Sequence, residues 1–208
     1  MNLAIVDPAE SRHISKTCSG YDIEQLIRTA AGSGIRKVFY AVDTYRKDII
    51  NYLGDKEFCI PVSMIPVITN TRSDGVSAVI PLLGEESVCF IASDLIPCNN
   101  VISEFIKFSE IAENADGIIS VVRSGDYINP LCIALNEDNT IIKFSELKDG
   151  YGWAAGGLYF FGADVIPEIC ELLQKMNYDI RIVLNDIIKQ GFRLVGFALP
   201  VSDKKREN

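Results

Sequence analysis

The chain alternates between short apolar segments and amphipathic segments, and this rhythm constrains its fold more than any other feature. Apolar runs typical of strands buried on both faces recur at Asn2–Val6, Ile35–Val42, Ser87–Ala92 and Gly117–Val122. Segments with the apolar spacing of helices begin at Asp22, Thr44 and Val101. This order predicts a three-layer α/β/α fold around a mixed, mostly parallel central sheet.

Several element boundaries follow from local signals. We predict Asp22 as a helix N-cap, Thr44 as the start of the second helix and a strand over Phe58–Ile65 that Pro61 places near a sheet edge or bulge. A short helix is expected at Gly75–Leu83. The helix at Val101–Glu113 would direct Phe105, Phe108 and Ile111 inward.

The pattern changes after residue 122. Leu131–Leu135 and Thr140–Phe144 flank a turn of four polar residues and predict a hairpin, and Gly157–Phe161 predicts another strand. Two helices, Asp164–Lys175 and Ile180–Gln190, and a strand at Arg193–Leu199 complete the chain. We expect one domain over residues 1–208, with an α/β half (1–122) and a mixed half (123–208).

Composition excludes several classes of protein. The net charge of −8 disfavours a general nucleic-acid binder, but a small anionic ligand held with a divalent cation remains compatible with it. The apolar runs fall far short of the ~20 residues that span a bilayer, and the N-terminus lacks a basic signal region. Six cysteines without a CxxC pair and a single histidine, His13, argue against zinc. Cys59, Cys89 and Cys132 lie in apolar runs, and we expect a reduced, cytoplasmic protein.

Asp94 is the first candidate functional residue. It directly follows an apolar strand, and open α/β sheets bind ligands at the carboxyl ends of their strands. A carboxylate there suits Mg²⁺, which prefers oxygen ligands. The alternative is that Ser93 and Asp94 cap the following turn.

Five segments, in order, resemble those of the sugar-phosphate nucleotidylyltransferases, and together they cover nearly the whole chain. They are Asp22–Tyr52, Ser87–Ile96 with Asp94 at the end of its apolar strand, Asn139–Glu146 with Ile-Ile-Lys-Phe-Ser-Glu, Ala155–Phe161 with Ala-Gly-Gly-Leu-Tyr-Phe-Phe, and Leu184–Phe197. The resemblance implies a Rossmann-like nucleotide-diphospho-sugar transferase fold, with a nucleotide-binding half (1–122) and a substrate-binding half (123–208). It also implies that Asp94 is a metal ligand.

The N-terminal loop departs from the family pattern. The family signature L-A-A-G-x-G-T-R cradles nucleotide phosphates with backbone N–H groups. The corresponding stretch in this chain is Val6-Asp7-Pro8-Ala9-Glu10-Ser11-Arg12, which contains no glycine. Pro8 has no N–H to donate, and Asp7 and Glu10 would repel a triphosphate. By resemblance, Arg12 and Lys16 would be the catalytic cations; an ordinary solvated loop is the alternative.

The remaining family positions are partly altered. The resemblance assigns substrate contacts to Gly75 in Asp-Gly-Val-Ser, to Glu146 and Lys148 in Glu-Leu-Lys, and to Gly156 and Gly157. Strand packing is the alternative for the last two glycines. Asp203 stands where the family has its second metal aspartate. Trp153 and Tyr151 either stack on a base or sugar ring or anchor a loop.

The resemblance implies nucleotidyl transfer from a nucleoside triphosphate to a sugar phosphate or similar phosphorylated alcohol, with Mg²⁺ as cofactor. Homo-oligomerisation is compatible with it, and no nucleic acid or membrane partner is expected. Two alternatives stay open: a degenerate, non-catalytic homologue that binds a nucleotide-sugar or a protein partner, and a glycosyltransferase of the same fold. The glycosyltransferases typically carry D-x-D, whereas Ser93-Asp94-Leu95-Ile96 holds one acid.

Overall fold

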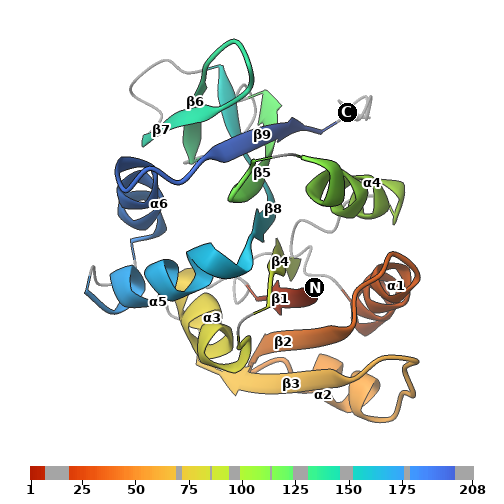
Figure 1. The fold of residues 1–208 in the computed structure, drawn as a ribbon. Coiled ribbons are helices and arrows are strands. Elements are labelled where there is room, and N and C mark those ends of the chain that lie inside the picture. The colour runs from red at the N-terminus through yellow and green to blue at the C-terminus, as the bar shows by residue number, and fades with distance from the viewer. Residues whose placement is uncertain are drawn as a thin grey trace, which may run out of the picture.

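The computed structural model of the chain describes residues 1–7, 19–68, 72–84, 86–93, 99–112, 114–123, 131–145, 152–175 and 179–199. These residues form a mixed, mostly parallel sheet that helices cover on both faces (Figure 1). The predicted three-layer α/β fold is confirmed. The division at residue 122 into two halves stays a prediction.

Seven strands form the main path of the sheet, in the order β3-β2-β1-β4-β8-β5-β9. They are β1 (Asn2–Val6), β2 (Lys37–Asp43), β3 (Val62–Val67), β4 (Val88–Ala92), β5 (Gly117–Arg123), β8 (Trp153–Phe161) and β9 (Leu194–Ala198). Pairs along this path are parallel except where β8 runs antiparallel between β4 and β5. The four strands predicted to share one sheet do so, and β3 is an edge strand that begins directly after Pro61.

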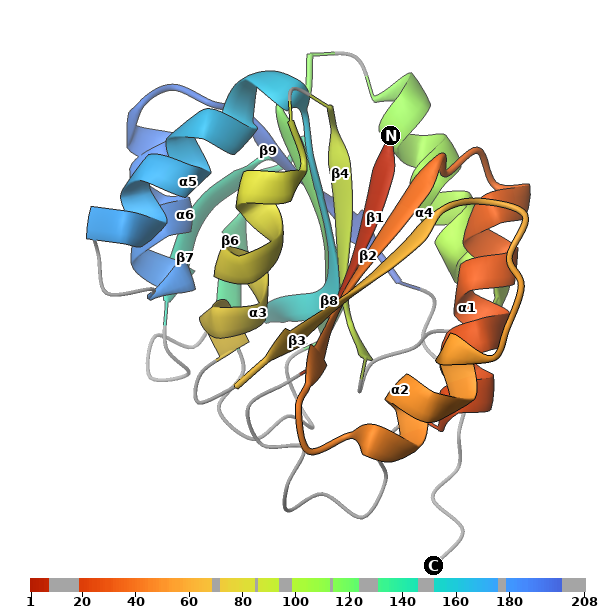
Figure 2. The same cartoon turned by 90° about the horizontal axis from the view of Figure 1, so that it is seen from below.

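Alternate residues of the strands enter two hydrophobic cores. In β1, Leu3 and Ile5 join the core under α1 (Gly20–Gly32), α2 (Lys47–Gly54) and α4 (Asn99–Ile111). Ala4 and Val6 join the core under α3 (Arg72–Val79), α5 (Ile166–Lys175) and α6 (Ile180–Lys189). Figure 2 shows these two groups of helices on opposite faces of the sheet. Burial on both sides explains why the strands are apolar along their whole length.

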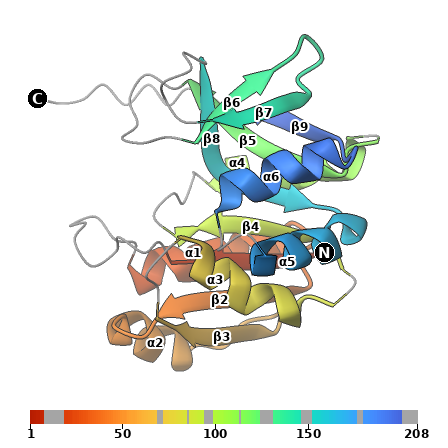
Figure 3. The same ribbon diagram turned by 90° about the vertical axis from the view of Figure 1, so that its left-hand side faces the viewer.

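The predicted hairpin is present as β6 (Cys132–Leu135) and β7 (Ile141–Ser145), and β6 also pairs with β8 (Figure 3). Asn139 takes a left-handed conformation in the turn, with φ of 62°. Its carbonyl accepts a hydrogen bond from the Gly196 N–H of β9 at 2.8 Å. The hairpin is therefore fastened to the edge of the main sheet.

Two predicted helix starts are wrong. The N-cap of α1 is Ser19, while Asp22 is the third helical residue, and each side chain accepts a hydrogen bond from the other residue's backbone N–H. Donation by Ser19, from its hydroxyl and then its N–H, lowers the pKa of Asp22. The second helix begins at Lys47 rather than Thr44, because the Asp43 carboxylate accepts the Tyr45 N–H and holds the intervening residues in a turn.

One prediction about a buried side chain is also wrong. Ile111 is the last residue of α4 and is 72% exposed, whereas Phe105 is buried as expected. Cys59 is exposed because it precedes β3, while Cys89 and Cys132 lie in strands and are buried. Burial raises the pKa of the Cys89 thiol to about 12. None of the helices in the described ranges is long and apolar enough to cross a bilayer.

Candidate functional site

The sheet has a topological switch point between β1 and β4. From β1 the chain moves outward to β2 and β3, and it then returns to place β4 on the other side of β1. Because all four strands are parallel, their carboxyl ends meet at one edge of the sheet. Open α/β sheets bind their ligands outside this edge, at the point where the strand order reverses. Asp7 and Ser93 are the residues that directly follow β1 and β4 there.

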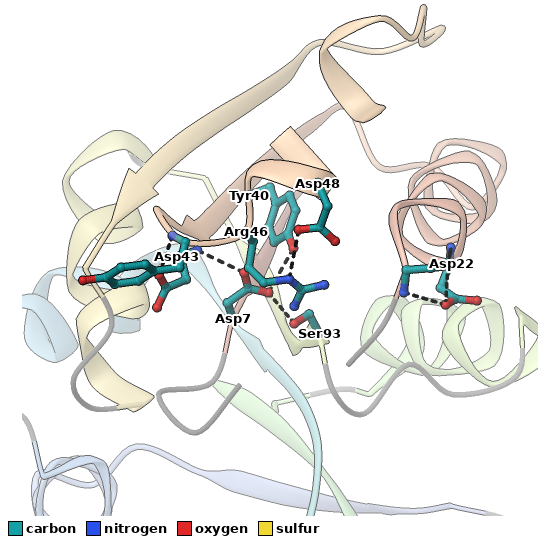
Figure 4. Close-up of polar contacts among 9 residues, drawn as sticks. Asp7, Asp22, Tyr40, Asp43, Arg46, Asp48 and Ser93 are labelled. Atoms are coloured by element: carbon teal, nitrogen blue, oxygen red, sulfur yellow. Dashed lines mark hydrogen bonds and ion pairs between the residues drawn. The ribbon is translucent and has the colours of Figure 1, made fainter. Parts of the chain in front are cut away.

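Asp7 accepts three hydrogen bonds at this switch point (Figure 4). Its Oδ1 accepts from the Tyr40 hydroxyl at 2.9 Å and from the Ser93 hydroxyl at 2.5 Å. Its Oδ2 accepts from the Asp43 N–H at 3.0 Å. The residue is fully buried, and its own N–H donates to Ala41 O at 3.0 Å. One carboxylate thus joins the carboxyl ends of β1, β2 and β4.

This arrangement differs from the prediction for Asp7. The sequence places Asp7 in a loop where its charge would face a triphosphate, whereas the structure turns the carboxylate into the protein. Three donors solvate the buried charge in place of water. The repulsion expected from this residue is correspondingly weaker than that of a carboxylate pointing into the site.

The chain after β2 makes a tight turn beside Asp7. The Asp43 Oδ1 accepts the Tyr45 N–H at 2.9 Å, and the Asp43 carbonyl accepts the Arg46 N–H at 2.8 Å. The Arg46 side chain is 13% exposed, and its Nε lies 3.5 Å from the Asp48 carboxylate. Tyr45, by contrast, is 68% exposed at this edge of the sheet. The side chains at and after the end of β2 thus comprise the carboxylates of Asp43 and Asp48, the exposed Tyr45 and the largely buried guanidinium of Arg46.

Gly75 lies inside α3, where the helix packs directly on the sheet. A Cβ atom at this position would lie 2.3 Å from Val6 Cγ1 and 3.4 Å from the Ala41 Cβ. Close packing of α3 on β1 and β2 therefore requires glycine here, independently of any ligand. The substrate contact assigned to Gly75 by resemblance stays a prediction.

Gly156 and Gly157 lie in the middle of β8, opposite an irregularity in the pairing with β5 between Ile119 and Val121. A Cβ at Gly156 would lie 2.8 Å from both Ser120 Oγ and Leu199 Cδ1. Gly157 has φ of 87°, a conformation that glycine adopts without strain. The strand-packing alternative thus has a geometric basis, and a role for these glycines in sugar binding stays a prediction.

Trp153 begins β8, and the Arg123 guanidinium lies 4.1 Å from the centre of its ring. This cation–π contact joins the first residue of β8 to the last residue of β5. It supports the anchoring interpretation of Trp153. Tyr151 lies outside the described residues.

Six of the predicted site residues lie outside the described residues: Arg12, Lys16, Asp94, Glu146, Lys148 and Asp203. Within the described ranges, no group of three or more histidine, cysteine, aspartate or glutamate side chains is placed to hold a metal ion. At the switch point, the polar residues that the structure describes are Asp7, Asp43 and Ser93 with their neighbours.

Sequence reasoning missed the role of Asp7, although a signal for it exists. Val6 pairs with Ala92 in the parallel register of β1 and β4, so the residues after them, Asp7 and Ser93, come side by side. Both are polar residues that directly follow an apolar strand. The missing information is the strand order, because only the adjacency of β1 and β4 brings the two together.

No protein-family model matches this sequence, and no curated protein sequence matches it. Solved structures do match. The inositol-1-phosphate CTP transferase from T. maritima aligns with a TM-score of 0.67 and 16% identity, over 95% of this chain and 85% of that one. A UDP-glucose pyrophosphorylase complexed with UDP-glucose aligns with a TM-score of 0.65 and 13% identity, over 95% of this chain and 90% of that one. The chain therefore has the nucleotide-diphospho-sugar transferase fold.

Proposed function

We propose that this protein is a nucleotidyltransferase that transfers a nucleoside monophosphate from a nucleoside triphosphate to a sugar phosphate or similar phosphorylated alcohol. The observation that supports this most is the shared fold over 95% of the chain with an inositol-1-phosphate CTP transferase and a UDP-glucose pyrophosphorylase. Fold alone does not determine function, so the residues at the switch point carry the rest of the argument.

Strand connectivity supports a nucleotide site between β1 and β4. Ser93 is buried and bonded to Asp7, and Asp94 is the next residue along the chain. Asp94 therefore follows, in the sequence, a strand whose carboxyl end lies where open α/β sheets bind ligands, and this supports its proposed role. Arg12 and Lys16 belong to the segment that leaves β1 at the same edge.

The reaction would be an in-line displacement at phosphorus. A phosphate oxygen of the acceptor attacks the α-phosphorus of the triphosphate, a new P–O bond forms, and the bond to the β-phosphate breaks as pyrophosphate leaves. The nucleophile is already ionised, so no general base is needed. The protein supplies alignment and charge neutralisation, for which Arg12 and Lys16 are the assigned cations.

Mg²⁺ fits the chemistry of this edge of the sheet. Asp7 and Ser93, the described residues that follow β1 and β4 there, carry carboxylate and hydroxyl oxygens, the type of ligand atom that hard cations prefer over nitrogen and sulfur. Asp94 and Asp203 would hold the ion, which would neutralise charge on the triphosphate. Asp7 is not assigned as a ligand, because its two oxygens accept three hydrogen bonds.

Ligand binding and turnover test the proposal. We expect nucleoside triphosphates with Mg²⁺ to raise the melting temperature by mass action, and pyrophosphate release to require a phosphorylated acceptor. Asp94→Asn keeps the side-chain volume and removes the charge, so pyrophosphate release should collapse while the fold survives. Asp164→Asn is the matched control, because Asp164 is exposed and follows Phe161, the last residue of β8. Phe161 pairs with Val88 at the start of β4, so this control lies at the other edge of the sheet from the carboxyl end of β4.

Other outcomes would overturn the proposal. Stabilisation by nucleotide-sugars alone would favour the glycosyltransferase alternative. Stabilisation by neither class of ligand would favour a non-catalytic homologue that binds a protein partner, for which the absence of glycine from the segment after β1 is the best support. Wild-type turnover in Asp94→Asn would remove the metal assignment.

A further inference from the structure

The Asp7 carboxylate joins two different parts of the switch point through the same oxygen atom. Its Oδ1 accepts the Tyr40 hydroxyl from β2 and the Ser93 hydroxyl from the end of β4. The two donors lie on opposite sides of β1, because β2 and β4 are its two neighbours in the sheet. Removing one hydroxyl therefore changes the connection to one neighbouring strand and leaves the connection to the other.

Burial makes these contacts strong constraints. Asp7, Tyr40 and Ser93 are 0%, 0% and 3% exposed, so water cannot readily replace a lost partner. Hydrogen bonds to an ionised group are shorter and stronger than those between neutral groups, and the Ser93–Asp7 contact is 2.5 Å long. The hydrogen bond to Asp7 thus holds the side chain of Ser93, the residue directly before Asp94, in place.

From these contacts we propose that Asp7 is a positioning residue: it fixes Ser93, the residue that directly precedes Asp94 in the sequence, against β1. The expected effect on triphosphate binding rests on the proposed function. The positioning of Ser93 itself rests only on the hydrogen bonds described above. In this chain a carboxylate follows β1 where the resembling family has a small residue. Its charge serves to hold the β4 end in place.

Ser93→Ala and Tyr40→Phe form a matched pair of variants for the test. Each removes one hydroxyl that donates to Asp7 Oδ1 and leaves the carboxylate in place. Three quantities are compared: the free energy of unfolding in urea, amide hydrogen exchange of the peptide spanning residues 92–98, and the calorimetric affinity for CTP and for UTP with Mg²⁺. Because both variants lose a buried hydrogen bond, both should be less stable than the wild type.

The positioning role predicts that the variants differ in the other two quantities. Ser93→Ala should speed exchange in the 92–98 peptide and weaken triphosphate binding by about tenfold, the order of one hydrogen bond to a charged group. Tyr40→Phe should leave both at wild-type values, since its hydroxyl belongs to the β2 side. A purely structural role would move both variants in proportion to their loss of stability.

Equal exchange of the 92–98 peptide in the two variants would overturn the inference. Faster exchange in Ser93→Ala alone supports it, whether or not the wild type binds a triphosphate. If the wild type binds neither CTP nor UTP, that result counts against the proposed function. The exchange comparison still decides the role of Asp7, so the two failures are distinguishable.

Discussion

Asn185 of α6 binds both main-chain groups of Phe144 in β7. Its Oδ1 accepts the Phe144 N–H at 2.9 Å, and its Nδ2 donates to the Phe144 carbonyl at 2.9 Å. A side-chain amide here supplies the two hydrogen bonds that a further strand would supply. It also covers part of an edge that would otherwise be open to pairing with another chain.

Asn185→Ala should lower the free energy of unfolding by about 1–3 kcal/mol, because it leaves a donor and an acceptor of β7 without their partner. Asp186→Ala is the matched control on the next residue. Asp186 pairs with the exposed Lys189, and a surface pair of this kind contributes about 0–1 kcal/mol. Urea unfolding of both variants measures the difference, and equal losses would show that Asn185 does not stabilise β7.

Gly75→Ala should destabilise the protein by about 1–3 kcal/mol, because its Cβ would overlap Val6 Cγ1 in the core. Val6→Ala should relieve that overlap, so the double variant should be more stable than the sum of the two single changes predicts. Gly54→Ala is the control, since nothing lies within 4 Å of its Cβ position. Additive losses in the double variant would contradict the packing explanation for Gly75.

The layer architecture could be predicted because burial on both faces leaves a direct trace in the strands. Val88–Ala92 is apolar throughout, and four of its five residues are buried. Ends of elements were less predictable, because a reciprocal cap such as Ser19 with Asp22 leaves two candidates for the first residue of α1. Ile111 fits the helical spacing but falls on the last residue of α4, so its side chain faces solvent.

The candidate site could be predicted only in part. A carboxylate after an apolar strand pointed to the carboxyl edge of the sheet, where Asp7 and Ser93 do lie. What the sequence could not indicate was that the Asp7 charge turns inward, because this depends on Tyr40 and Asp43 from a neighbouring strand. Glycines were also ambiguous: Gly75 and Gly156 have packing reasons that sequence alone does not separate from ligand contact.

Glu24 should make stability depend on pH in the acid range. Its pKa is lowered by donation from the Tyr52 hydroxyl first, then by Arg28, with a smaller contribution from Lys56. A depressed pKa stabilises the fold above the ordinary value of 4.5, and this stabilisation is lost as the pH falls through the lower, folded-state value.

Glu24→Gln should therefore be less stable than the wild type at neutral pH, and the difference should shrink in acid. Glu104→Gln, at an exposed position of α4, is the control. Urea unfolding of both variants across this pH range checks the prediction. A difference between Glu24→Gln and the wild type that does not change with pH would contradict it.

Triphosphate affinity should be weak for a chain of this fold, because the segment after Asp7 lacks the glycines that let backbone N–H groups approach phosphates. Pro8 has no N–H, and Glu10 adds a negative charge. Each lost hydrogen bond to a charged phosphate is worth about 1.5–3 kcal/mol, so two lost bonds weaken binding by on the order of a hundredfold or more. We expect dissociation constants in the millimolar range by calorimetry with Mg²⁺ and each triphosphate.

The double variant Pro8→Gly with Glu10→Gln should bind triphosphates more tightly than the wild type. Pro61→Gly, which removes a proline from the position before β3, is the control and should leave the affinity unchanged. Micromolar binding by the wild type would contradict the prediction and show that this segment binds phosphate by another route, which would favour a working enzyme.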